Sequence, residues 1–209
     1  MVDLNKLYQE LSNNLGQSGW WPADSKEEII LGAILVQNTN WNNADLALTE
    51  LKRRTGLDPQ NILNLTQEEL MRIIKSSGFY KNKSRAILAT FEWLDKEGWD
   101  YEAISDRYGS KLRSELLKIP GVGNETADVF QVYIFDRPVL IADSYTRRLF
   151  AKLGYTKTKT YEELWKQVKL PSNFTYLDAQ EFHGLIDNFG KEYLRYDGLF
   201  EKSFLAGMK

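Results

Sequence analysis

Residues 116–130 read Leu-Leu-Lys-Ile-Pro-Gly-Val-Gly-Asn-Glu-Thr-Ala-Asp-Val-Phe, and residues 141–149 read Ile-Ala-Asp-Ser-Tyr-Thr-Arg-Arg-Leu. In the first stretch, apolar residues at helical spacing end at Pro120, and Gly121 and Gly123 permit the positive φ of a tight turn. A second helix is expected directly after this turn. Its first N–H groups have no intrahelical acceptor, and exposed amides of this kind bind phosphate. The stretch therefore predicts a phosphate-binding helical hairpin.

The second helix of the hairpin is expected to begin at Asn124 or Glu125, and Asp143 lies eighteen residues after Glu125. This hairpin, followed at that spacing by a carboxylate, resembles the helix-hairpin-helix region of the DNA glycosylase superfamily related to endonuclease III. The resemblance puts Asp143 at the position of the catalytic aspartate. A Pro-Gly-Val-Gly turn alone also occurs in non-enzymatic DNA-binding modules, so the resemblance depends on further matches.

Three further segments match the same superfamily in chain order. They are Gly-Ala-Ile-Leu-Val-Gln-Asn-Thr-Asn-Trp at 32–41, Ser-Gly-Phe-Tyr-Lys-Asn-Lys at 77–83 and Phe-His-Gly at 182–184. The resemblance therefore covers most of the chain. Within the superfamily, Trp-Trp-Pro at 20–22, the Gln-Asn-Thr run and the glutamate at 125 are most similar to bacterial 3-methyladenine DNA glycosylases that lack the iron–sulfur cluster.

Apolar residues recur at helical spacing along most of the chain, and the only β-like run is 138–141, so the sequence predicts an all-α fold. Helices are expected at about 3–15, 25–37, 41–54, 66–76, 81–95, 99–106, 109–118, 124–135, 143–153, 160–168 and 176–192. Short connections between amphipathic helices favour an orthogonal helical assembly. The resemblance implies two helical lobes with an active-site cleft between them. A central lobe at 26–137 would end in the hairpin, and a second lobe would combine 1–25 with 138–209.

The chain of 209 residues contains no cysteine, and His183 is its single histidine. Iron–sulfur clusters, zinc–thiolate sites and disulfides all need cysteine sulfur, so no such cofactor or bridge is expected. His183 is interpreted as a hydrogen-bonded core residue, because one histidine gives little support for a metal site or a catalytic triad. No metal bound by side chains is expected. The resemblance implies a possible monovalent cation at backbone carbonyls near Ile119 and Val122.

The formal net charge of −2 is unfavourable for a DNA partner, because duplex binding depends on neutralising phosphates. The local field matters more, and basic residues gather after two of the matched segments. They are Lys81, Lys83 and Arg85 after Gly78, and Arg147, Arg148 and Lys152 after Asp143. Each cluster is expected either to contact DNA or to form an ordinary solvated face.

The sequence has no apolar run long enough for a membrane span and no signal-peptide pattern. We therefore expect a monomeric, cytoplasmic protein of bacterial type that is associated with the nucleoid and acts on damaged double-stranded DNA.

Cleaving an N-glycosidic bond builds positive charge on the deoxyribose, which a carboxylate such as that of Asp143 would stabilise. The alternative is that Asp143 only caps the helix that follows, and both roles are compatible. Bifunctional relatives have a lysine at the position of Glu125 that forms a Schiff base with the sugar. Glutamate cannot do this, so the resemblance implies a monofunctional enzyme. Glu125 is expected to line the base pocket or to be an ordinary first-turn acid.

A base must leave the stack to reach a buried aspartate, and flipped bases are held by aromatic side chains. A cationic base such as 3-methyladenine gains an additional cation–π attraction over tryptophan. The residues expected in the base pocket are Trp20, Trp21, Pro22, Trp41 and Glu125. One of the two adjacent tryptophans, and also Trp41, could instead belong to the core. Trp93, Trp99 and Trp165 are expected to pack.

Gln37 and Asn38 follow an apolar helix, so they are expected either to enter the duplex beside the flipped base or to cap that helix. The residues expected to contact DNA are Gln37, Asn38, Lys81, Lys83, Gly121, Val122, Gly123, Asn124 and Arg147.

Two other functions stay open. One is a monofunctional glycosylase of the same fold that acts on uracil, mismatched thymine, or adenine opposite damaged guanine, although such enzymes rely more on hydrogen bonds to a neutral base. The other is a non-catalytic helix-hairpin-helix DNA-binding protein, which would need neither Asp143 nor the tryptophans.

Overall fold

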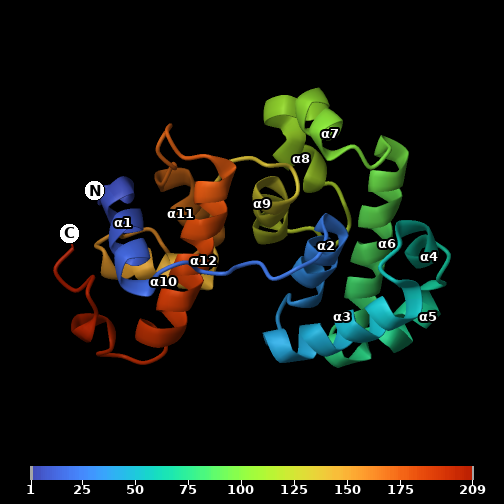
Figure 1. Cartoon of the computed structure of the whole chain (residues 1–209), viewed down its shortest axis with the longest axis horizontal. Helices are drawn as coiled ribbons and strands as arrows, with labels where there is room; N and C mark the ends of the chain where they lie inside the picture. Colours follow the sequence, from blue (N-terminus) through green and yellow to red (C-terminus); the bar gives the residue numbers. More distant parts are fainter. Residues whose placement is uncertain (1, 209) are drawn as a thin grey trace. The chain divides into compact units, whose positions relative to one another are not determined.

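The computed structural model describes residues 2–208, and within them the chain is helical without any strand (Figure 1). The predicted all-α fold is therefore confirmed. The helices are α1 (Leu4–Leu15), α2 (Lys26–Leu35), α3 (Trp41–Thr55), α4 (Pro59–Leu63), α5 (Gln67–Ile73), α6 (Tyr80–Glu97), α7 (Tyr101–Tyr108), α8 (Leu112–Leu116), α9 (Asn124–Tyr133), α10 (Ser144–Lys152), α11 (Tyr161–Gln167) and α12 (Tyr176–Tyr193). Short 3-10 helices are η1 (Lys75–Ser77), η2 (Gly109–Lys111) and η3 (Phe200–Lys202).

Helix α4 was not expected from the sequence. It is five residues long, which is too short to show an apolar period, and it begins with the Asp58 N-cap and Pro59 at its first turn. The β-like run at 138–141 forms no strand.

The chain divides into two compact units. The terminal unit comprises Met1–Pro22 and Asp136–Lys209, and the central unit comprises Ala23–Phe135. Figure 1 shows both chain ends, in blue and red, within one group of helices. The lobes expected from the sequence had their boundaries at 25–26 and 137–138, whereas the boundaries between the observed units lie at 22–23 and 135–136.

In the terminal unit, α1 and α10 both pack against α12. Helix α1 supplies Leu7 and Leu11, which are four residues apart and completely buried on one face. Helix α12 supplies Phe182 and Phe189 to the same core. Burying side chains of this size contributes about 1.5–3 kcal/mol each, and Leu149 and Phe150 of α10 belong to the same core.

In the central unit, α2 lies inside the other helices and packs against α3, α6 and α9. Its residues from Ile30 to Leu35 are all buried, which a helix shows only when it is covered on several sides. None of the helices described for residues 2–208 has the length and apolarity of a membrane span.

Candidate active site

The hairpin of the central unit consists of α8, a turn at 117–123 and α9. Helix α9 begins at Asn124, as predicted, and its N-cap Gly123 contributes no side-chain hydrogen bond. The turn is closed by the Val122 N–H, which donates to the Ile119 carbonyl at 3.0 Å. Since the cap has no side chain, ligands can approach the first amides of α9 directly.

Gly121 brings the hairpin turn into direct contact with α6. Its φ is +85°, and a Cβ at this position would lie 2.5 Å from the Ala86 Cβ. The turn therefore needs glycine both for its backbone conformation and for the close approach to α6.

A buried ion pair joins the two helices of the hairpin. The Arg113 guanidinium donates from Nε to Asp128 Oδ1 at 2.9 Å and from Nη2 to Oδ2 at 3.1 Å. Asp128 is completely buried and also accepts from Gln131 Nε2 at 2.6 Å. Sequence reasoning missed this pair, because polar residues on short helices are normally read as solvated. The fixed fork geometry of arginine sets the distance between α8 and α9.

Gln37 is attached to the hairpin. Its Nε2 donates to the Gly121 carbonyl at 3.2 Å and to Thr126 Oγ1 at 2.9 Å. The side chain is partly buried and bridges the end of α2 to the hairpin, so it is not a simple helix C-cap. Asn38 beside it is exposed and has a φ of +52°. The structure therefore places the Gln37–Asn38 turn directly beside the hairpin.

The expectation that Lys83 belongs to a basic DNA-binding surface is wrong. The residue is only 2% exposed, and its Nζ donates to the carbonyls of Leu35 at 2.8 Å and Ser77 at 2.6 Å. Burial lowers the pKa of Lys83 to about 8. Lys81 and Arg85 on the same helix are exposed, so the surface expected at this segment keeps these two charges.

Three other predicted site residues of the central unit lie at helix starts. Trp41 is the first residue of α3, where it is partly buried behind the Asn40 N-cap. Glu125 is exposed in the first turn of α9. Asn124 accepts a hydrogen bond from Arg113 Nη2 at 3.2 Å through its Oδ1, so its side chain supports the hairpin.

Asp143 in the terminal unit is the N-cap of α10, the role that the sequence left open beside catalysis. Its Oδ1 accepts the Thr146 N–H at 2.7 Å. Its Oδ2 lies 3.8 Å from His183 Nε2, and the two side chains are 16% and 10% exposed. The interpretation of His183 as a core residue is therefore incomplete, because its ring faces the candidate catalytic carboxylate.

The surroundings of Asp143 keep its carboxyl group ionised. Burial raises the pKa of Asp143, but the facing His183 and the Thr146 hydrogen bonds outweigh this and hold the pKa below its usual value. A partly buried carboxylate fixed as a helix cap is suited to stabilise positive charge, since it needs no reorganisation.

The Phe-His-Gly segment connects Asp143 to the tryptophan segment. A methyl group on Gly184 would lie 2.6 Å from Trp20 Cβ and 2.5 Å from Ser18 Oγ, so glycine lets this segment lie against α12. The Glu181 carboxylate holds the segment there, accepting the Ser18 N–H at 2.7 Å and the hydroxyl at 2.6 Å. Helix α12 thereby brings Trp20 and His183 to the same region of the terminal unit.

Trp20 and Trp21 are both partly buried, and their ring centroids are 5.1 Å apart. The ammonium group of Lys191 lies 5.0 Å from the Trp20 ring centroid and 2.5 Å from the Asp187 carboxylate. Pro22, which follows, is exposed. Trp20 also borders a surface depression of about 670 Å³, whose lining does not include Asp143.

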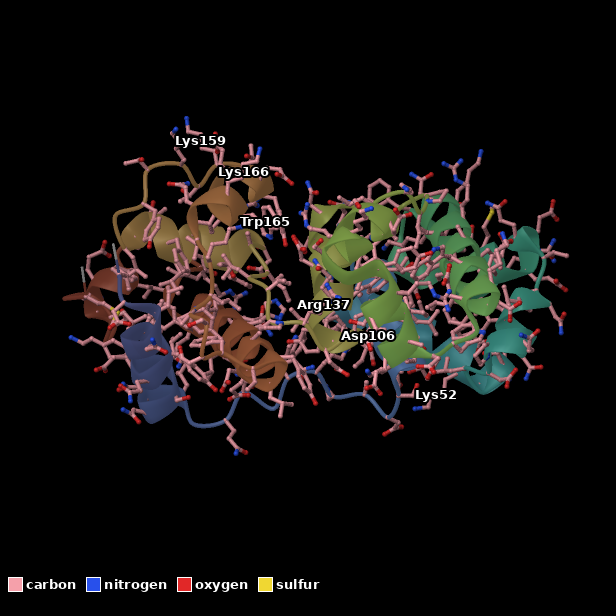
Figure 2. The ribbon with its side chains drawn as sticks, turned by 90° about the horizontal axis from the view of Figure 1, so that it is seen from above. Lys52, Asp106, Arg137, Lys159, Trp165 and Lys166 are labelled. Atoms are coloured by element: carbon pink, nitrogen blue, oxygen red, sulfur yellow. The ribbon has the colours of Figure 1, made fainter. Side chains whose placement is uncertain are left out.

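The remaining tryptophans make packing contacts. Trp93 and Trp99 lie against Phe135 and Phe91, with ring centroids 6.3 and 5.3 Å apart. Trp165 lies on α11 (Figure 2). The Lys169 ammonium group lies 3.9 Å from its ring centroid.

Arg147 lies in the first half of α10 and is partly buried, so the structure leaves its predicted DNA contact as a prediction. Among residues 2–208, no cluster of three or more acidic or histidine side chains could hold a metal ion. The possible cation near Ile119 and Val122 also stays a prediction. The Ile119 carbonyl already accepts one hydrogen bond, and a carbonyl oxygen has a second lone pair for such a ligand.

Comparison with known sequences identifies the family. Residues 31–173 match the HhH-GPD superfamily of base excision DNA repair proteins. A protein of Methanocaldococcus jannaschii whose name assigns it to the DNA repair glycosylases is 35% identical over 93% of this chain and 90% of its own length. Endonuclease III of Thermotoga maritima is 30% identical over 71% of this chain and 68% of its own length.

Solved structures show the same fold. The 3-methyladenine DNA glycosylase MagIII of Helicobacter pylori, bound to 1,N6-ethenoadenine, superposes with a TM-score of 0.73 at 24% identity, covering 92% of this chain and 98% of its own. A trapped covalent complex of endonuclease III with DNA gives a TM-score of 0.72 at 21% identity, covering 95% and 91%. By sequence and by fold, this chain belongs to the HhH-GPD superfamily of base excision DNA repair proteins.

Proposed function

We propose that this protein is a monofunctional DNA glycosylase that removes alkylated purines of the 3-methyladenine type. The observation that carries the proposal is Asp143. Within a family of base excision repair proteins, it is an ionised, partly buried carboxylate fixed as a helix cap and faced by His183.

In this reaction Asp143 would stabilise the positive charge that develops on the deoxyribose and would orient the attacking water. Its low pKa favours the first role over proton donation, since a group that stays ionised cannot act as a general acid at neutral pH. An alkylated purine is already a good leaving group, so selection of the base matters more than acid catalysis.

The absence of strand cleavage is inferred from Glu125. This residue occupies the first turn of α9, at the position where bifunctional relatives have a lysine. A carboxylate cannot form a Schiff base with the sugar, so water is the nucleophile and an abasic site is the product.

Trp41 is the residue we favour for stacking on a cationic base. The Lys191 ammonium group lies over the Trp20 ring and would repel a second cation there, which argues against Trp20 in this role. Trp41 follows the Gln37–Asn38 turn directly, so it belongs to the surface region that the hairpin also forms. The likeness to MagIII supports the fold alone, so the proposal that the lesion is an alkylated purine rests on these side chains.

DNA binding is assigned to three segments of the central unit: the hairpin turn, the Gln37–Asn38 turn, and the start of α6 at Lys81. All three are mutually connected, because Gln37 bonds to Gly121 and Gly121 contacts α6. Amides of the hairpin would donate hydrogen bonds to phosphate oxygens, and the ammonium group of Lys81 would neutralise a phosphate.

The test is Asp143→Asn. Asparagine is as good an N-cap as aspartate, so the substitution removes the charge while α10 keeps its cap. Base release from methylated duplex DNA should fall by about 10²-fold or more, while binding to abasic-site duplex stays close to that of the wild type.

A matched control is Asp58→Asn, the same change at another helix N-cap, whose carboxylate accepts the Asn61 N–H at 2.9 Å. It should leave base release unchanged. Turnover of Asp143→Asn within a few-fold of the wild type would show that the carboxylate has no part in the chemistry.

A further inference from the structure

Lys83 is the largest completely buried side chain described for this chain, and the proposed chemistry does not use it. Burying an ammonium group is costly unless it gains strong hydrogen bonds in return. The partners of Lys83 are two backbone carbonyls rather than a carboxylate, so the side chain forms no ion pair in these two contacts.

The two carbonyls belong to segments far apart in the sequence. Leu35 is the last residue of α2, and Ser77 is the last residue of η1. A single ammonium group therefore joins the ends of two helical segments, and the orphan carbonyls at helix ends are suitable acceptors for a cation.

An exposed turn follows each of these carbonyls. Asn38 has a φ of +52° in the first turn and Phe79 has a φ of +46° in the second. Left-handed backbone is unfavourable for Phe79 and is adopted more readily by asparagine, so the Phe79 turn in particular needs contacts that stabilise it. The Phe79 ring is 65% exposed, which excludes its burial as the source of that stabilisation.

The hairpin is attached to the same structure. The Gln37 amide donates to the Gly121 carbonyl, and Gly121 lies against Ala86, one helical turn after Lys83 on α6. The hairpin turn, the Gln37–Asn38 turn and the Phe79 turn therefore all meet at the first half of α6. The buried ammonium group of Lys83 is bonded to the carbonyls that precede the second and third of these turns.

We propose that Lys83 is a positioning residue, whose buried ammonium group fixes the two exposed turns at 36–40 and 78–81 beside the hairpin in the arrangement that binds DNA. The proposal depends on the proposed function only for its assignment of this surface to DNA. Lys83 itself touches no phosphate, since its Nζ points into the protein.

The test compares Lys83→Met with Lys81→Met, which is the same chemical change at an exposed site two residues earlier on α6. Binding to an abasic-site duplex is measured over a range of salt concentrations. Lys81→Met should lower the slope of log K against log [salt] by about 0.9, the value for one lost phosphate contact. Lys83→Met should bind about tenfold more weakly with the wild-type slope, because it disturbs the surface without removing a surface charge.

Two results would overturn the proposal. One is a salt slope for Lys83→Met that falls as it does for Lys81→Met, which would mean that the ammonium group reaches phosphate. The other is a folded Lys83→Met that binds within about twofold of the wild type.

Amide hydrogen exchange of the wild type provides a second measurement if Lys83→Met does not fold. Peptides covering 36–40 and 78–81 should exchange slowly despite the exposed side chains there, and fast exchange of either turn would contradict the proposed role of Lys83. Absence of base release from every lesion would count against the proposed function alone, since both measurements here report binding or exchange.

Discussion

Gly121→Ala should destabilise the protein, because it adds both backbone strain and a steric clash with α6. The φ of +85° costs a residue with a Cβ about 1–2 kcal/mol. The added methyl would lie 2.5 Å from Ala86 Cβ and 3.3 Å from its Cα, a clash with a helix backbone that has little freedom to move. Overpacking of this kind costs about 1–3 kcal/mol. The free energy of unfolding should therefore fall by about 2–5 kcal/mol, which denaturant unfolding measures directly.

A double-mutant cycle with Ala86→Gly separates the two costs. Removing the Ala86 methyl relieves the clash but not the backbone strain, so the cycle should give a favourable interaction free energy of about 1–3 kcal/mol. Gly123→Ala is the matched control. Its φ is −91° and a Cβ there meets nothing within 4 Å, so only the loss of a glycine N-cap should matter, and its unfolding free energy should fall by about 1 kcal/mol at most.

Binding of abasic-site duplex should also weaken in Gly121→Ala, because the turn carries the hairpin amides. A Gly121→Ala protein as stable as Gly123→Ala would show that the hairpin turn does not need glycine at 121, and an interaction free energy near zero would show that the two methyl groups do not clash.

Three further predictions concern single side chains. His183→Gln should raise the pKa of Asp143, since His183 helps to hold it down, and should move the acid limb of the base-release rate to higher pH; an unchanged limb would contradict this. The pKa of Lys83 is about 8 in the folded protein and 10.5 in the unfolded chain, so between these pH values the unfolded state binds more protons. The free energy of unfolding of the wild type, measured in urea relative to Lys83→Met, should therefore rise from pH 8 to pH 10. Trp41→Ala should lose about 1–3 kcal/mol of stacking and impair excision far more than duplex binding, while Trp41→Phe should retain much of the excision activity. Parallel loss of binding and excision would show that Trp41 does not line the base pocket.

The hairpin could be predicted because its signals are local. Pro120, Gly121 and Gly123 each have a backbone property that fixes the turn whatever surrounds it. The N-cap geometry of Asp143 was predictable for the same reason, since the residue types that follow it begin a helix.

The roles of Lys83 and His183 could not be predicted, because both depend on segments far away in the sequence. Lys83 lies in a run with Lys81 and Arg85, and only the partner carbonyls at Leu35 and Ser77 distinguish it from a solvated charge. His183 faces Asp143 across forty residues of chain. A glycine directly after His183 was an available signal, since it indicates a close approach to that side of the helix.

Release of an alkylated base from an intact strand is what distinguishes the proposed monofunctional enzyme from a bifunctional one. The most direct measurement incubates the wild type with a duplex that contains 3-methyladenine, follows the free base by chromatography and the strand on a denaturing gel, and adds borohydride in a parallel sample. We expect free base to appear, strand breaks to form only after alkali, and no covalent adduct to be trapped, because Glu125 replaces the Schiff-base lysine. A stoichiometric trapped adduct, or release of uracil but not of 3-methyladenine, would contradict the proposed function.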